Sequence, residues 1–553
     1  MTEQSFDYIV VGAGSAGCVL ANRLTEDGQR SVLLLEYGGS DRSIYIQMPS
    51  ALAIPMNREQ FNWFYHTEPE PGLNNRRMHT PRGKVLGGSS SINGMVYVRG
   101  NPFDFERWQE LGATGWGYRD VLPYFKRAER RATGGDTYRG GDGLLGTCYG
   151  PQKNPLHAAW LAAGQQAGYP RTQDMNGFQQ EGFGSMDMTV ENGVRASAAN
   201  AYLKPARARA NLTVWTETRV LRVLFEGKRA IGVRVMVDGV EKTVRAKDEV
   251  ILSAGSIASP QLLKLSGVGA GAELQQFSIP QVHELPGVGE NLQDHLEVYF
   301  QVACKEPITL YSVMNPFSKL KIGVQWLLLK NGLGATNHFE TCAFIRSRAG
   351  IRYPDIQYHF LPMAVSYDGS DVATEHGFQA HVGPMRSKSR GWVRLASRDA
   401  ADKPKVQFNY MSHPDDLPEF RAAVRLTREI FAQPAFDRYR GREIAPGAEM
   451  TSDEQIDAFV REKVESAYHP SCSCKMGAAS DPMAVVGADT RVLGLDGLRV
   501  VDSSIMPAIT NGNLNAPTIM LAEKAADHIR GKAMLARAEV PFYEAPQWQT
   551  AQR

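Results

Sequence analysis

Three glycines near the N-terminus have the spacing of a turn that binds the pyrophosphate of a dinucleotide. Gly12 permits a tight turn, Gly14 lets the backbone approach a phosphate, and Gly17 lets a helix pack closely on a sheet. Ser15 lies within this motif and is expected to contact the cofactor, and the free N–H groups of the helix that follows favour an anion. Glu36 is placed further along the chain to accept hydrogen bonds from a ribose. The motif predicts a dinucleotide cofactor and does not separate NAD from FAD.

A second loop, rich in glycine and hydroxyl side chains, lies between residues 82 and 94. Such a loop can wrap backbone amides and small side chains around a planar or phosphorylated ligand. Its basic start and apolar interior favour this interpretation over a flexible surface loop. The residues expected to contact the ligand are Arg82, Gly87, Gly88, Ser89, Asn93 and Gly94.

Polar residues in the second half of the chain could carry further chemistry. Histidine is the commonest general base, but a lone histidine before a proline, as His469 is, is more often structural, so both interpretations stay open. Glu340 interrupts an apolar stretch, and the residues alone favour a solvated carboxylate on a strand face. Cys472 and Cys474 lack a second cysteine pair, so we expect reduced structural thiols there and no metal site.

The elements that must position the first glycine motif follow from the spacing of apolar residues. A β-branched and aromatic run predicts a buried strand over residues 6–11, and helical spacing predicts a helix over 18–24. A second apolar run predicts a strand over 31–35 that ends on Glu36. Strand, glycine turn, helix and strand follow one another in the order of a βαβ nucleotide-binding unit.

Further elements are expected to extend this unit. Residues 211–255 alternate between apolar and polar, which predicts a strand meander. A short helix is expected to be capped by Ser259, to have Pro260 at its first position and to end at Gly267. A strand over 498–502 and a helix that begins near Asn515 bring the chain back to the nucleotide side.

Between residues 295 and 455 the pattern changes to longer alternating strands, which predict an antiparallel sheet on the substrate side. A chain of 553 residues exceeds the size of one core, so we expect two domains. The predicted class is α/β (α+β overall), with a Rossmann-like domain and a second, antiparallel-sheet domain. The expected boundaries are 1–157, 196–294 and 455–540 for the nucleotide domain, 158–195 and 295–454 for the substrate domain, and 541–553 for a tail.

Composition limits the other possibilities. A net charge of +2 gives no electrostatic case for nucleic acid as a partner. The N-terminus lacks the pattern of a signal peptide, and the apolar run at 324–329 is flanked by Lys321 and Lys330, so no transmembrane helix is expected. Six scattered cysteines suit a reducing cytoplasm. We therefore expect a cytoplasmic protein and leave peripheral contact with the inner face of the membrane open.

Together these motifs resemble the glucose–methanol–choline (GMC) flavoprotein oxidoreductases. The carriers are the motif 12–17 with Glu36, the loop 82–93, the segment 255–269, the stretch 469–477, and residues 501–515. The stretches 68–71, 337–340, 408–413 and 439–443 look like the bacterial choline-oxidising dehydrogenases of the family. The resemblance implies FAD rather than NAD, and oxidation of choline to betaine aldehyde and on to glycine betaine, an osmoprotectant.

The resemblance also assigns roles to residues. It implies that His469 takes the substrate's hydroxyl proton while a hydride passes to the flavin N5, and that Asn515 is the partner of His469. It implies that Glu340 faces the trimethylammonium group. The other expected substrate contacts are Trp63, Tyr468 and His376, with His359 as the alternative to His376, and the further cofactor contacts are Val220, Asp502 and Asn513.

One departure from the family concerns the bond to the flavin. Family members that are choline oxidases carry a linking histidine at the position of Ile92, whose side chain has no nucleophilic atom. We therefore expect non-covalent FAD, and electrons passed to a quinone or another respiratory carrier. The alternatives are an oxidase that uses oxygen directly, a dehydrogenase for another primary alcohol, and a flavin-binding protein without catalysis.

Overall fold

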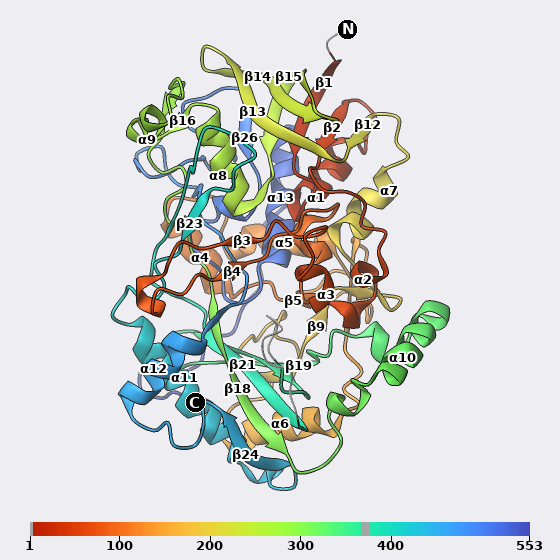
Figure 1. The fold of residues 1–553 in the computed structure, drawn as a ribbon, viewed down its shortest axis with the longest axis vertical. Coiled ribbons are helices and arrows are strands. Elements are labelled where there is room, and N and C mark those ends of the chain that lie inside the picture. The colour runs from red at the N-terminus through yellow and green to blue at the C-terminus, as the bar shows by residue number, and fades with distance from the viewer. Residues whose placement is uncertain (1–3, 366–374) are drawn as a thin grey trace.

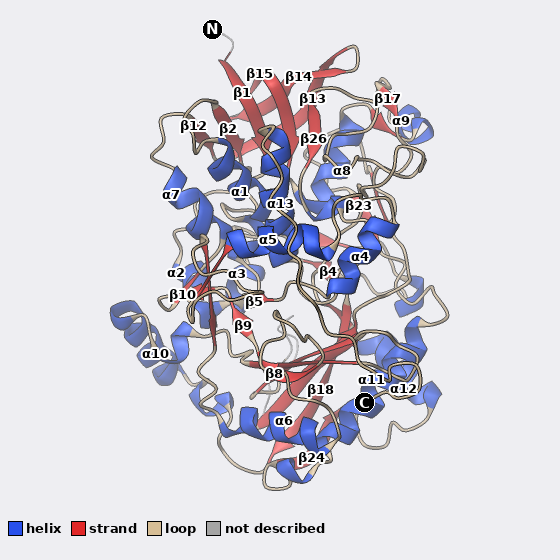
Figure 2. Cartoon of the chain, turned by 180° about the vertical axis from the view of Figure 1, so that it is seen from behind, coloured by secondary structure: helices blue, strands red, loops and turns tan. Residues whose placement is uncertain are grey.

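A computed structural model describes residues 4–365 and 375–553. Two large sheets lie toward opposite ends of an elongated molecule, and helices pack around both of them (Figures 1 and 2). The upper sheet of Figure 1 contains the parallel βαβ unit, and the lower sheet is antiparallel. The expected fold class is confirmed. In the part of the chain that the structure describes, no helix is long and apolar enough to cross a bilayer.

The upper sheet, here the nucleotide sheet, is built from segments far apart in sequence. Its order is β12-β2-β1-β15-β14-β13, and β26 pairs with the C-terminal half of β15. Parallel pairing of β1 with β2 and with β15 aligns their carboxyl ends, where the glycine turn follows β1. The strands are β1 (Gln4–Val11), β2 (Val32–Leu35), β12 (Leu212–Trp215), β13 (Thr218–Glu226), β14 (Arg229–Val237), β15 (Val240–Leu252) and β26 (Leu498–Val500).

Helices α1 (Ser15–Leu24) and α13 (Asn515–Ile529) pack together beside this sheet, and α5 (Tyr118–Ala128) packs on α13. Gly17 allows the close approach of α1, because a Cβ at this position would lie 1.8 Å from the Gly12 carbonyl oxygen. Helix α13 begins at Asn515 as expected, whereas α1 begins at Ser15, three residues before the predicted helix over 18–24.

Helix α8 corrects one prediction. It runs Gly255–Leu265, so Ser259 and Pro260 lie inside it rather than at its start. Pro260 has no N–H for the carbonyl of Ser256, four residues earlier. The hydroxyl of Ser473 donates to that carbonyl instead, with an O···O distance of 2.6 Å. A side chain from a distant segment thus replaces the hydrogen bond that the proline cannot make.

The lower sheet, here the substrate sheet, is antiparallel in the order β24-β18-β21-β20-β19-β8. Strand β25 pairs with the first residues of β18. One face is apolar: Phe360 packs against Trp160 of α6 (Pro155–Gln166), and Phe378 packs against Phe431 of α11 (Asp416–Phe431). The other face carries polar side chains. The strands are β8 (Gly182–Ser185), β18 (Leu296–Cys304), β19 (Thr341–Ile345), β20 (Ile356–Leu361), β21 (Gly377–Pro384), β24 (Arg440–Ala445) and β25 (Glu465–Ser466).

Smaller elements connect the two sheets. Within the region 295–455 that was expected to form the substrate sheet, β22 (Trp392–Arg394) pairs instead with β23 (Lys405–Gln407), outside that sheet. The remaining helices are α2 (Ile44–Gln47), α3 (Ala53–Met56), α4 (Pro102–Glu110), α6 (Pro155–Gln166), α7 (Lys204–Ala206), α9 (Gly271–Gln276), α10 (Pro316–Leu329), α11 (Asp416–Phe431) and α12 (Asp453–Lys463). The remaining strands are β3 (Tyr65–His66), β4 (His79–Thr80), β5 (Val96–Tyr97), β6 (Glu129–Arg131), β7 (Leu145–Tyr149), β9 (Asp187–Met188), β10 (Val190–Glu191), β11 (Val194–Arg195), β16 (Val268–Gly269) and β17 (His283–Glu284).

Candidate active site

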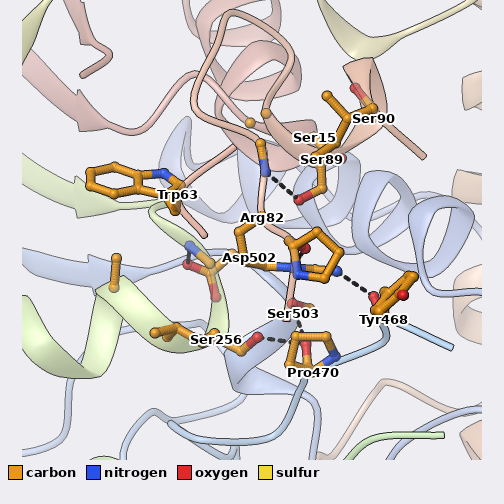
Figure 3. Close-up of a pocket in the computed structure, with 18 of the residues that line it drawn as sticks. Ser15, Trp63, Arg82, Ser89, Ser90, Ser256, Tyr468, Pro470, Asp502 and Ser503 are labelled. Carbon is orange, nitrogen blue, oxygen red and sulfur yellow. Dashed lines mark hydrogen bonds between the residues drawn. The ribbon is translucent and has the colours of Figure 1, made fainter. Parts of the chain in front are cut away.

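A cavity of about 330 Å³ is lined by residues of both sheets. It extends from Glu36, at the end of β2, to His469, which lies next to the polar face of the substrate sheet. In the close-up of Figure 3, Trp63 and Tyr468 lie on opposite sides with Arg82 between them. The cavity therefore joins the predicted cofactor site and the predicted substrate site in one continuous space.

Two helix starts meet at the cofactor end of the cavity. No side chain caps α1, whose N-cap is Gly14, or α13, whose N-cap is Leu514. The hydroxyl of Ser15 donates to Oδ1 of Asn515 at 2.8 Å, which joins the first turns of the two helices. The free N–H groups and positive dipole ends of both helices are thus available to an anionic ligand in the cavity.

The second glycine loop docks directly on the first. The amide of Gly87 donates to the carbonyl of Ala13 at 2.7 Å. A Cβ on Gly88 would lie only 2.7 Å from the Cα of Gly14, so this approach requires glycine. The two loops together form a cradle made almost entirely of backbone.

Glu36 is oriented by backbone amides. Its Oε2 accepts from Ala13 N at 2.9 Å and its Oε1 accepts from Gly38 N at 2.7 Å. Burial raises the pKa of Glu36 to about 7, and these amide hydrogen bonds act in the opposite direction. Nearby, the Ser253 hydroxyl is buried, lines the cavity and has no hydrogen-bond partner within residues 4–365 and 375–553. Both groups can therefore bond to a polar ligand.

Most of the predicted cofactor residues reach the cavity, but not all of them. Gly17 and Gly87 are not among its lining residues and act instead on the packing of α1 and of the second loop. Asp502 lines the cavity, and its Oδ2 accepts from the Gly255 amide at 2.9 Å and the Ser259 hydroxyl at 2.6 Å, which fixes the start of α8. The other lining residues that were predicted for the cofactor are Gly12, Gly14, Ser15, Glu36, Arg82, Gly88, Ser89, Asn93, Gly94, Val220 and Asn513.

His469 is held between two polar partners. Its Nδ1 lies 3.1 Å from His295 Nδ1, and its Nε2 lies 3.1 Å from Asn513 Nδ2. Burial, followed by the neighbouring His295, His359 and Arg82, lowers the pKa of His469 well below its ordinary value. The imidazole is therefore neutral at neutral pH, as a base must be before it accepts a proton.

The hydrogen bonds of His295 determine which nitrogen of His469 carries the lone pair. His295 Nε2 lies 2.9 Å from the carbonyl oxygen of Met385, which can only accept, so Nε2 carries the proton. Burial lowers the pKa of His295 to about 4, so His295 is neutral and its Nδ1 is an acceptor. His469 must then donate from Nδ1, which leaves a lone pair on its Nε2. This assignment follows from the hydrogen-bond network, and it places the basic nitrogen toward Asn513.

In the structure Asn513, rather than the expected Asn515, contacts His469. Asn513 fills that position, and its Oδ1 accepts from Gln357 Nε2 at 3.2 Å, which orients its NH2 group toward His469. Asn515 bonds to Ser15 on the cofactor side. The two asparagines are separated by a single residue, but the turn that precedes α13 sends their side chains to different parts of the cavity.

Glu340, expected to face the substrate cation, lies outside the cavity lining. Its carboxylate is buried and accepts from the Gln152 amide at 2.5 Å and from the Thr336 hydroxyl at 2.7 Å, and it does not line the cavity. At the substrate end of the cavity, the carboxylate among the lining residues is Glu297 on β18. Burial acts to raise the pKa of Glu297, but His381, His359 and His295 together lower it below the ordinary value. Glu297 is therefore the ionised group of the substrate end.

His359, the alternative, takes the place expected for His376. His359 lines the cavity, and its Nε2 lies 3.2 Å from Asn513 Oδ1. His376 bonds through Nδ1 to the Thr309 hydroxyl at 2.8 Å and is not among the lining residues. His376 is the residue just before β21, so its backbone lies at the far end of that strand from His469.

The two predicted aromatic contacts lie in different surroundings. Trp63 stacks on Tyr37, with ring centroids 5.0 Å apart, and Tyr37 directly follows Glu36. Trp63 therefore belongs to the cofactor half rather than to the substrate end. Tyr468 lines the cavity next to His469, and its carbonyl accepts from Arg82 (Figure 3).

Aromatic rings not singled out from the sequence surround Glu297. The Tyr299 and His381 rings are 4.2 Å apart, and Phe339 lies 5.4 Å from His381. Glu297, Tyr299 and His381 occur at alternate positions of paired strands, and that spacing alone suggests a solvent-facing side. The sequence feature that could have identified these residues is the alternation of polar and aromatic side chains, which places them together on one face of a buried sheet.

Comparison with known proteins identifies the class of this molecule. The profile of the GMC oxidoreductase N-terminal region matches residues 6–297, and that of the C-terminal region matches residues 387–522. The chain belongs to the GMC oxidoreductase family. Membership implies FAD as the cofactor.

Particular relatives match over nearly the whole chain. The oxygen-dependent choline dehydrogenase of Photobacterium profundum is 60% identical over 551 residues, which are 99% of this chain and 97% of the relative. That of Vibrio vulnificus is 59% identical and covers 100% and 99% of the two chains. The crystal structure of pyridoxine 4-oxidase from Mesorbium loti has a TM-score of 0.86 at 31% identity, covering 95% and 99%. A formate oxidase structure has a TM-score of 0.89 at 24% identity, covering 96% and 99%, and shows the fold alone.

The residues around the cavity fit FAD. The backbone cradle of Gly14 and Gly88 and the uncapped starts of α1 and α13 suit its pyrophosphate. Glu36 suits a ribose. The unpartnered Ser253 hydroxyl marks a point where a polar ligand would complete the hydrogen bonding.

Proposed function

We propose that this enzyme oxidises choline to betaine aldehyde and passes the electrons to FAD. The single observation that carries the proposal is that one cavity holds both a neutral histidine base, His469, and an ionised carboxylate, Glu297. Oxidation of a primary alcohol requires a base, which His469 supplies. Binding of a quaternary ammonium requires a negative charge, which Glu297 supplies. The names of full-length relatives at 57–60% identity support the same substrate.

The cofactor is held, in this proposal, by the cradle of Gly12, Gly14 and Ser15, with Glu36 on the ribose. FAD, when bound, supplies the acceptor for the hydride that leaves the α-carbon of the alcohol. Ile92 lines the cavity with a side chain that has no nucleophilic atom, which supports attachment without a covalent bond at this position.

His469 acts as the general base. In the structure the lone pair on its Nε2 faces the Asn513 NH2 group; with substrate bound, this lone pair accepts the hydroxyl proton of the substrate, while the Nδ1–H remains bonded to His295. Asn513 lies against the same nitrogen, so a hydroxyl held there meets both side chains, and the amide orients it. Removing this proton raises the electron density at the oxygen and so favours loss of the hydride from the neighbouring carbon.

Glu297 recognises the cation. A trimethylammonium group has no N–H donor, so charge and aromatic faces must bind it. A carboxylate about 4 Å from such a cation gains about 4 kcal/mol of Coulomb energy at an effective dielectric constant near 20, and desolvation of both groups offsets part of it. The rings of Tyr299 and Phe339 lie beside His381 on the same side of the cavity and add an aromatic surface.

The same site supports a second oxidation. Betaine aldehyde hydrates to a gem-diol, which presents a hydroxyl and an α-hydrogen in the same relation as choline does. His469 can take that proton in the same way, so the product of two turnovers is glycine betaine. Accumulation of the aldehyde in equimolar amount, with no carboxylate formed on long incubation, argues against this step.

The electron acceptor and the location of the enzyme are part of the proposal. We expect reduced enzyme to pass electrons to a quinone or another respiratory carrier, in a cytoplasmic protein. The relatives are named oxygen-dependent, which favours oxygen as an acceptor beside the carrier. Rates of oxygen uptake and of reduction of a water-soluble quinone, measured with the same enzyme and choline, separate the two.

Anaerobic addition of choline to the holoenzyme tests the function directly. The yellow flavin absorbance should bleach with choline and much more slowly with ethanol or another small uncharged alcohol. If another primary alcohol bleaches the flavin and choline does not, that alcohol rather than choline is the substrate of this enzyme. Absence of bleaching with every alcohol in a broad panel would favour a flavin-binding protein without catalysis.

A further inference from the structure

Helix α10 (Pro316–Leu329) extends away from the body of the protein. Both views show it at the side of the molecule, beyond the edge of the substrate sheet (Figures 1 and 2). Among its residues only Trp326 is buried, and the Trp326 indole N–H donates to the carbonyl of Gly193 at 2.7 Å. One buried side chain thus anchors the helix, and most of its other residues are exposed.

The face of α10 opposite this anchor is strongly apolar. Phe317 is 77% exposed, Leu320 66% and Leu328 76%. With Val324 and Leu327 these residues follow the spacing i, i+3, i+7, i+10 and i+11, which places all five on one side of a helix. Leu329 and Leu333 are exposed at the end of the helix as well. An apolar surface of this kind on a monomer marks a contact site rather than a scattered exposure.

The charges around this face have one sign. Lys319, Lys321 and Lys330 lie on or directly after the helix, and residues 307–339 contain no aspartate or glutamate. Neither Lys319 nor Lys321 forms an ion pair with any residue in 4–365 or 375–553. The Lys330 ammonium lies 3.7 Å from the centre of the Trp326 ring. The surface is therefore apolar and cationic together.

We propose that this face of α10 is a docking site for a membrane surface that contains anionic lipids. A helix with one apolar face and basic residues beside it lies in the plane of the lipid headgroups, with the apolar side chains inserted and the lysines at the phosphates. A second copy of this chain suits the face less well. A twofold contact would bring the same lysines of both copies together without an acidic partner in this segment.

The position of α10 gives this docking a consequence for the cavity. Ten residues after the helix, Phe339 lines the cavity, and the Asn337 side chain between them donates to the carbonyl of Gly94 at 2.8 Å. A docked α10 therefore holds one wall of the cavity close to the membrane. If the proposed function is correct, a lipid-soluble acceptor reaches the enzyme from that side, but docking itself does not depend on the substrate.

Vesicle flotation with the purified holoenzyme tests the proposal. Vesicles of pure phosphatidylcholine are compared with vesicles of phosphatidylcholine and phosphatidylglycerol, at low and at high salt. We expect the enzyme to float with the anionic vesicles at low salt, and the bound fraction to fall at least tenfold in the double variant Phe317→Ser and Leu328→Ser. Lys319→Glu with Lys321→Glu should abolish the preference for anionic vesicles.

The control is Val240→Ser, which removes a side chain that is 54% exposed on the distant β14–β15 turn and should leave flotation unchanged. The flavin spectrum and anaerobic bleaching by choline show that each variant is folded, and neither readout should change. The proposal is overturned if the wild type does not float with anionic vesicles. It is also overturned if light scattering finds a dimer that the double serine variant dissociates while vesicle binding is absent.

Discussion

Glu297 and His381 face each other across strands β18 and β21, with 3.0 Å between Glu297 Oε1 and His381 Nδ1. The Gln379 amide fixes the orientation of the His381 imidazole, because its NH2 group lies 2.6 Å from His381 Nε2. The Gln379 oxygen in turn accepts from the Gln301 NH2 and the Val365 amide. His381 Nδ1–H therefore donates to Glu297 and holds an ionised carboxylate in a buried site.

The selectivity for a cation should depend on Glu297 and not on Glu340. The isostere 3,3-dimethylbutan-1-ol keeps the shape of choline and removes only the charge, so the ratio of the two kcat/KM values isolates the charge term. We expect wild type to prefer choline by about ten- to a thousand-fold. Glu297→Gln should remove most of that preference, mainly through KM. Glu340→Gln, the matched control, should leave the ratio unchanged. If Glu340→Gln removes the preference and Glu297→Gln does not, Glu340 is the residue that binds the cation.

Asn513 and Asn515 should have separable roles. Asn513→Ala removes the amide beside His469 Nε2 and should slow anaerobic flavin reduction by about a hundred- to a thousand-fold, with FAD retained. Asn515→Ala removes the partner of Ser15 and should weaken retention of FAD while affecting reduction less. Stopped-flow reduction and the flavin content after gel filtration measure the two effects. If reduction is slow in Asn515→Ala but not in Asn513→Ala, then Asn515 is the residue that acts together with His469.

The pH dependence should follow the lowered pKa of His469. Because the folded pKa lies well below the ordinary 6.5, the base stays unprotonated as the pH falls from neutrality through 6.5. The rate of flavin reduction should therefore be flat in that range and decline only at lower pH. The unfolded histidine binds a proton below about 6.5 and the folded one does not, so its contribution to the stability is lost as the pH falls below that value.

Thermal unfolding of wild type and His469→Ala across this range measures the stability effect. The destabilisation of wild type relative to the variant should grow as the pH falls below 6.5. His469→Ala should also lose about a hundred- to ten-thousand-fold in flavin reduction at neutral pH. An acid limb with a midpoint above 6.5 would show that the base is not the buried, neutral imidazole described above.

His295 acts on the base through its acceptor nitrogen. His295→Leu removes the acceptor for His469 Nδ1–H and should slow flavin reduction and change the pH profile. His295→Gln offers a side-chain carbonyl to the same donor and should restore part of the rate. Equal losses in both variants, with an unchanged pH profile, would indicate that His295 only fills space.

FAD should leave the protein on denaturation. Ile92 has no atom that can form a bond to the isoalloxazine, so the yellow colour should remain in the supernatant after the acid-precipitated protein is removed. Absorbance of supernatant and pellet measures the distribution. A coloured pellet would mean that another lining residue forms the bond.

The sequence contained enough to predict the nucleotide sheet. Gly12, Gly14 and Gly17 determine a local turn and a helix, and those depend on residues close together in the chain. The start of α8 was misplaced because Pro260 looks like a first helical residue, whereas the Ser473 hydroxyl from far along the chain lets the helix begin earlier. Local patterns cannot report such a distant partner.

The substrate end was harder to predict for a physical reason. Glu297 and His381 alternate with apolar neighbours along their strands, as residues facing water do, and only the assembled sheet shows that this face encloses a cavity. Glu340 has the opposite character, an acid in an apolar stretch, but its partners are the nearby Thr336 and the amide of Gln152. The choice between Asn513 and Asn515 depends on the backbone path into α13.

The bond between Ser15 and Asn515 has a consequence for how the protein is made. The two residues are 500 positions apart, and β26 joins the nucleotide sheet almost as late in the chain. At 5–20 residues per second, a ribosome needs roughly 25 to 100 seconds between these two points. Until then β15 presents an unpaired edge, and the half-made turn cannot retain its cofactor. A chain released early should therefore be a substrate for chaperones and proteases.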